Sequence, residues 1–157
     1  MRHAYISFPR SKIGEAKAMK LPCEVAVKSV VPAIRALLAI ELVETHDLRQ
    51  REVADLLGIT QTAISKYTHH VRGRILAVGD EDEVMTLIVH TAASLADGNM
   101  KGNALARRIC TTCKLVREKR LMCELCKRTN PNLDTAQCQL CSTSSCDRPS
   151  SDIKRTR

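Results

Sequence analysis

The sequence predicts a mainly α-helical protein in which a helix-turn-helix unit is followed by a further helix and a small Cys-rich module. Three observations support this fold class. Apolar residues recur at helical spacing in two long stretches, and two short helical segments lie between these stretches. The short segments are separated by about three residues that include a glycine. Seven of the eight cysteines lie between Cys110 and Cys146.

Changes in composition divide the 157-residue chain into five parts. Near the N-terminus, Pro9 and Gly14 interrupt a basic stretch that has no sustained period, and the Ser-rich C-terminal end has little apolar surface to bury. The predicted parts are a basic flexible arm (1–20), a helix-turn-helix domain (21–78), a helical linker or dimerisation segment (79–108), a Cys-rich module (109–146) and a disordered tail (147–157).

The first long apolar stretch, VVPAIRALLAIELVETHDL, predicts a core helix. Pro32 is acceptable in its first turn, where a backbone N–H has no helical partner. One face of the helix is formed by Ile34, Leu37, Leu38 and Leu42.

The stretch LRQREVADLLGITQTAISKY predicts the two short helices. Gly58 ends the first helix, Thr60 is a suitable N-cap for the second, and Ile59 is placed to pack on Ile64. The small Ala54 allows the second helix to cross close to the first. The apolar face of the first helix consists of Val53, Ala54 and Leu57.

In a helix-turn-helix, the N-terminal part of the second helix meets base edges in the major groove of DNA. Gln50 begins the preceding helix and is placed to contact a phosphate. Ordinary solvated polar side chains are the alternative for any one position, but their combination with the glycine turn and the small Ala54 favours DNA binding. The other candidate DNA-binding residues are Thr60, Gln61, Thr62, Ser65, Lys66, His69 and Arg72.

The second long apolar stretch predicts a helix that begins near Asp80, with Glu83 as the partner of Asp80 in a capping box, and that stops at Gly98. Its apolar stripe has two interpretations, either packing on its own domain or forming the contact of a homodimer. The stripe consists of Val84, Leu87, Ile88, Ala92 and Leu95.

The cysteines form three Cys-x-x-Cys pairs, and we expect each pair to direct two thiolates the same way from a tight turn. Because no histidine follows His90, an all-sulfur site is expected, and soft thiolates select zinc or iron–sulfur clusters. Cys146 is left over, and Cys23 would complete a set of eight by counting alone. The candidate metal ligands are Cys110, Cys113, Cys123, Cys126, Cys138 and Cys141.

The run QREVADLLGITQTAISKY, together with LPCE and the paired cysteines, resembles archaeal transcription regulators that have an Xre-type (lambda-repressor-like) helix-turn-helix and a Cys-rich tail. The resemblance extends from Leu21 to Cys141. It implies an iron–sulfur cluster that acts as a sensor, and DNA-facing roles at Gln50, Gln61, Thr62, Ser65 and Lys66. One departure is Arg49, which stands where this group often has a capping Ser.

The resemblance and the ligand chemistry favour a [4Fe–4S] cluster, and the alternative is a structural zinc site. The function expected is therefore a cytoplasmic, non-enzymatic regulator that binds double-stranded DNA as a homodimer, without a membrane or a small-molecule substrate. Residues 101–157 carry 13 Lys/Arg against 5 Asp/Glu, so metal-dependent ordering of this basic region is expected to change DNA affinity. An RNA-binding or adaptor zinc protein is a weaker alternative, because the chain has only three aromatic residues for base stacking.

Overall fold

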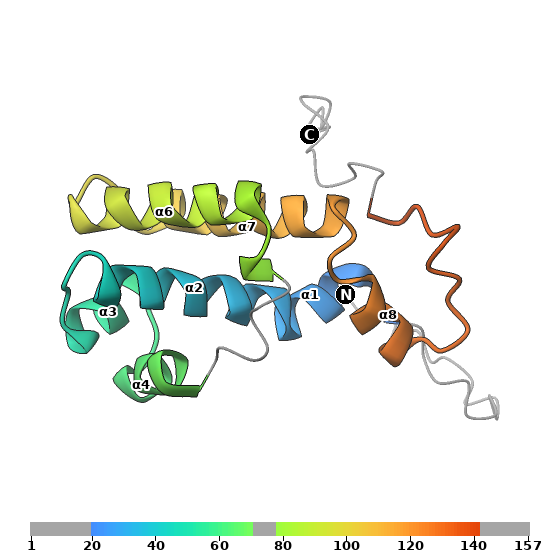
Figure 1. Cartoon of the computed structure of the whole chain (residues 1–157), viewed down its shortest axis with the longest axis horizontal. Helices are drawn as coiled ribbons and strands as arrows, with labels where there is room; N and C mark the ends of the chain where they lie inside the picture. Colours follow the sequence, from blue (N-terminus) through green and yellow to red (C-terminus); the bar gives the residue numbers. More distant parts are fainter. Residues whose placement is uncertain (1–19, 71–77, 142–157) are drawn as a thin grey trace, which may run out of the picture.

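The computed structural model describes residues 20–70 and 78–141 (Figure 1). All regular secondary structure within these residues is helical, which confirms the mainly α-helical fold class. The predicted arm, except for Lys20, and the predicted tail lie outside them, as do Arg72 and Cys146. The helices are α1 (Pro22–Lys28), α2 (Val30–Glu44), α3 (Gln50–Leu57), α4 (Gln61–His70), α6 (Asp82–Ala96), α7 (Asn103–Glu118) and α8 (Cys123–Thr129).

Helix α2 lies in the middle of the molecule. It contacts α6 and α7 on one side and α3 and α4 on the other, while α1 and α8 lie at the end where α2 begins (Figure 1). Apolar side chains surround this helix, and a helix that is apolar on several faces is stable only when it is buried. The buried residues of α2 are Val30, Ile34, Ala36, Leu38, Ala39 and Leu42.

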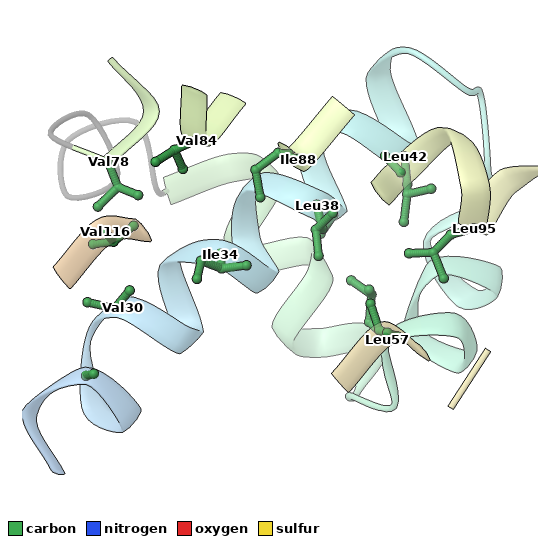
Figure 2. Packing of buried hydrophobic residues seen from close by; sticks show 14 of the residues in the cluster. Val30, Ile34, Leu38, Leu42, Leu57, Val78, Val84, Ile88, Leu95 and Val116 are labelled. Atoms are coloured by element: carbon green, nitrogen blue, oxygen red, sulfur yellow. The ribbon is translucent and has the colours of Figure 1, made fainter. Parts of the chain in front are cut away.

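The main core joins α2 to α6 and α7. Figure 2 shows Ile34 and Leu38 of α2 in one cluster with Ile88 of α6 and Val116 of α7. The apolar stripe predicted for the helix after residue 80 is therefore buried within the chain, with only Leu87 half-buried. This finding favours the core interpretation of the stripe. Its fully buried residues are covered by the same chain, so they cannot form the contact of a homodimer.

Helices α3 and α4 are joined by three residues. Gly58 adopts a left-handed conformation (φ 63°), which allows the N–H of Ile59 to bond the carbonyl of Ala54 at 3.0 Å. Thr60 then caps α4, because its hydroxyl accepts a hydrogen bond from the N–H of Ala63 at 3.2 Å. Ile64 is fully buried and holds α4 against the core.

The starts of α3 and α6 differ in how they are capped. At Arg49 the missing Ser cap is partly replaced, since the carboxylate of Glu52 accepts a hydrogen bond from the Arg49 N–H at 2.8 Å. The capping box predicted from Asp80 and Glu83 is wrong, because α6 begins at Asp82 after Glu81 and has no side-chain cap. The carboxylate of Glu83 is instead engaged by Lys119, from the C-terminal end of α7.

Helix α7 ends in a turn that normally requires glycine. The N–H of Leu121 bonds the carbonyl of Val116 at 3.1 Å, and Arg120 occupies the left-handed position between them with φ 61°. A residue with a side chain is uncommon in this conformation, so surrounding contacts must hold it there. The guanidinium of Arg120 supplies such contacts by donating to the backbone carbonyls of Thr135 and Ala136.

Lys119 joins the end of α7 to the start of α6. Its ammonium lies 2.6 Å from a carboxylate oxygen of Glu81 and 2.7 Å from one of Glu83. The hydrogen bond to Glu81, followed by the one to Glu83, raises the pKa of Lys119 above its ordinary value. The Lys119 side chain is 26 % exposed, so solvent and salt screen this interaction.

We predict that Lys119→Met lowers the melting temperature at neutral pH by a few degrees, whereas the same change at the exposed Lys101 has little effect. A folded-state pKa above the unfolded value means that the contribution is complete below about pH 10.5 and is lost as the pH rises through the raised pKa. Thermal unfolding at several pH values and salt concentrations measures the difference from wild type. A difference that grows with salt or with alkaline pH would contradict this role.

Candidate functional site

The first turn of α4 presents polar side chains to solvent. Gln61, Thr62 and Lys66 are exposed, and Ser65 is half-buried beside them. Thr60 is exposed as well, although its hydroxyl is engaged in capping the helix. Gln50 is half-buried as the first residue of α3. Residue 69 is the last of the DNA-facing candidates in α4, and its side chain lies outside the described part of the structure.

Among the described residues, the surface around α3 and α4 carries charges of both signs. Exposed Arg49, Arg51 and Lys66 are accompanied by exposed Glu52 and Asp55. This face is therefore suited to short-range hydrogen bonding more than to long-range attraction of a polyanion. By contrast, residues 103–129 carry eight Lys/Arg and two Glu, and α7 lies across α2 from α4 (Figure 1).

Two of the three Cys-x-x-Cys pairs lie in helices. Cys110 and Cys113 belong to α7, which runs through the predicted module boundary at residue 108, and Cys123 and Cys126 belong to α8. The expectation of tight turns was wrong for these two pairs. Residues three apart share one face of a helix, so the helix itself directs both sulfurs the same way. The third pair, Cys138 and Cys141, lies in the non-helical final segment.

A surface pocket brings the second and third pairs together. Its lining includes Cys123 from α8 and both Cys138 and Cys141 from the final segment, next to the guanidinium-bearing side chains of Arg117 and Arg120. Arg120 fixes the segment through the carbonyls of Thr135 and Ala136. The left-handed turn after α7 therefore determines where the last pair lies.

The thiols also influence one another electrostatically. Burial raises the pKa of Cys113, the positive charge of Arg117 opposes this effect, and Cys110, Cys23 and Cys141 raise the pKa further. Neighbouring thiols can act in this way only when they lie close to one another. The Cys113 thiol is therefore in the neighbourhood of sulfurs from α1, α7 and the final segment.

The same causes operate at the other two perturbed cysteines. Burial raises the pKa of Cys126, and Cys141, Cys123 and Cys138 add to the shift. Burial also raises the pKa of Cys141, against the opposing charge of Arg117, with contributions from Cys138, Cys123 and Cys23. Cys141 thus links the thiols of α7 to those of α8, and the six predicted ligands form one neighbourhood.

Sequence reasoning left Cys23 undecided and placed Arg117 only among the basic residues between the cysteines, without a contact to any one of them. The structure places Cys23 on α1, and a terminal nitrogen (Nη1) of Arg117 donates a hydrogen bond to the Cys23 sulfur at 3.3 Å. Counting cysteines gave the only signal for Cys23. The signal for Arg117 was its spacing of four residues from Cys113, which places both on one side of a helix.

The chemistry of the cysteines fits a metal group that is bound by thiolates. Seven described cysteines are free thiols, and no histidine follows His90 in the sequence. Soft sulfur ligands of this kind bind zinc or iron–sulfur clusters. Within residues 20–70 and 78–141, however, no three Cys, His, Asp or Glu side chains converge closely enough to hold a metal ion. The thiols are gathered in one region, and metal binding would require them to move closer together.

Comparisons with known proteins identified no relative of this chain. No protein family, no curated protein and no solved structure matches this chain. No helix in the described part of the chain has the length and apolar character needed to cross a membrane. The surface of α4 and the gathered thiols are therefore the two features on which a functional proposal can be built.

Proposed function

We propose that the protein is a sequence-specific, double-stranded DNA-binding regulator of transcription whose Cys-rich region binds a metal group that senses iron, sulfur or redox status. In this proposal α3 and α4 form a helix-turn-helix, and α4 is the recognition helix. The observation that carries it is the exposed polar first turn of α4, which the left-handed Gly58 and the buried Ile64 hold in a fixed position.

The exposed residues have distinct roles in this proposal. Gln61 and Thr62, at the start of α4, supply donors and acceptors to base edges, and Lys66 adds a cation one turn later. Gln50 and the first backbone N–H groups of α3 contact phosphate, which fixes the orientation of α4. Because the described residues around α3 and α4 carry charges of both signs, specificity in this proposal comes chiefly from these short-range contacts.

For the metal group we propose a [4Fe–4S] cluster, with structural zinc as the alternative. Support comes from the gathering of thiols from α7, α8 and the final segment near Arg117, whose positive charge partly opposes the rise in thiol pKa that burial causes. A cluster bound there would add a redox-sensitive group that is lost when oxidant rises or iron falls. The residues that would hold it are drawn from Cys110, Cys113, Cys123, Cys126, Cys138 and Cys141.

The proposal also includes a cytoplasmic location, no enzymatic activity and a homodimer. A dimer would place two recognition helices on half-sites one DNA turn apart. Since the apolar stripe of α6 is largely buried within the chain, the dimer contact has to use other residues. In this proposal, α2 couples the thiol region to the DNA-binding surface, because α2 contacts α1 and α7 as well as α4.

We predict that Gln61→Ala weakens binding to a selected duplex by about 1–3 kcal/mol and relaxes base preference, because it removes a side chain that reads a base edge. Lys66→Ala should also weaken binding. Lys101→Ala is the matched control, since Lys101 is an exposed lysine in the segment between α6 and α7. The measurement is selection from random duplexes followed by fluorescence anisotropy at fixed salt, with circular dichroism to confirm folding. Equal affinities for all four proteins would contradict recognition by α4.

We predict that anaerobically purified protein contains about four irons and four sulfides per chain and absorbs broadly near about 400 nm. Elemental analysis and an absorption spectrum measure this directly. One or two zinc ions in a colourless protein would assign the site to structural zinc. Protein that retains neither metal after anaerobic purification would contradict a metal group in this region.

A further inference from the structure

We propose that Cys23, on helix α1, is a ligand of the same metal group, so that metal binding ties α1 to α7, α8 and the final segment. This inference rests on the proposed function, because it adds a ligand to the metal site proposed there. It differs from that site in drawing one sulfur from the opposite end of the described chain.

The position of α1 against α8 is fixed by a reciprocal pair of hydrogen bonds. The backbone N–H of Lys20 donates to the side-chain oxygen of Asn130 at 3.1 Å, and the side-chain nitrogen of Asn130 donates to the Lys20 carbonyl at 3.0 Å. Asn130 directly follows α8, and α1 contacts α8 (Figure 1). The helix that bears Cys23 therefore begins beside the helix that bears Cys123 and Cys126.

Arg117 connects the sulfur of Cys23 to the thiol pocket. Its guanidinium donates to the Cys23 sulfur at 3.3 Å, and the same side chain lines the pocket with Cys123, Cys138 and Cys141. One arginine thus contacts a thiol from α1 and borders thiols from α8 and the final segment.

The pocket beside Arg117 already contains three thiols, Cys123, Cys138 and Cys141. A tetrahedral thiolate site needs four sulfurs, and Cys23, which Arg117 contacts, would supply the fourth from α1.

The competing explanation is that Cys23 only accepts the hydrogen bond from Arg117. Cys23→Ser separates the two explanations, since a serine hydroxyl still accepts a hydrogen bond but is a poor ligand for soft metals. Val27→Ser is the matched control, because Val27 is an exposed residue of the same helix. Circular dichroism establishes whether each full-length variant retains the helical fold.

The experiment measures the iron, sulfide and zinc retained after anaerobic purification, and the affinity of the metal-stripped chain for zinc ions in competition with a chelator. Cys23→Ser should bind zinc at least about tenfold more weakly than wild type, and Val27→Ser should match wild type. If wild type binds metal and Cys23→Ser binds it equally well, the inference is wrong while the proposed metal site stands. If wild type binds neither zinc nor a cluster, the metal part of the proposed function fails and Cys23 has no group to ligate.

A second measurement uses the wild-type chain alone and therefore does not depend on folding of a variant. Cys23 is exposed in the structure, so iodoacetamide should label it in the metal-free protein. Metal loading should protect it, as shown by mass spectrometry of the peptide that contains it. Equal labelling of Cys23 in the metal-loaded and metal-free proteins would overturn the inference.

Discussion

Burial of helix α2 on opposite sides is the constraint on which the rest of the described structure depends. Helices α1, α3, α4, α6 and α7 all contact α2, and α8 contacts α1. Each fully buried Leu or Ile contributes roughly 1.5–3 kcal/mol, so α2 cannot turn or shift without losing contacts in both neighbouring layers. The surface of α4 and the gathered thiols are therefore attached to one rigid element, although they lie at different places along it.

The parts of the fold that follow from local pattern were predictable from the sequence. The apolar period of α2 and α6, the left-handed Gly58 and the Thr60 cap all depend on residues that are close in the chain. The exposure of Thr62 and Lys66 follows from the same pattern, because burial of Ile64 turns them outward, and Gln61 is exposed as the first residue of α4. DNA binding by these residues remains a prediction, as do the metal ligands.

The remaining features depend on contacts between distant residues. A Cys-x-x-Cys pair directs its two sulfurs the same way both in a tight turn and in a helix. The spacing therefore did not reveal that the first two pairs lie in helices α7 and α8. The absence of glycine does not distinguish these two pairs either, because CQLC also lacks glycine and is not helical. Nothing local indicated that Lys20 pairs with Asn130, that Arg120 adopts a left-handed conformation, or that Arg117 donates to Cys23.

Helix α2 connects the two candidate surfaces, the first turn of α4 and the gathered thiols. Thiols from α7, α8 and the final segment surround Arg117, α1 joins them through Cys23, and α2 carries α4 on its other side. The most direct test is the affinity of the full-length protein for its selected duplex, measured with metal-loaded and metal-stripped samples at one salt concentration. The account predicts different affinities in the two states. Equal affinities would contradict the claim that the metal group controls DNA binding.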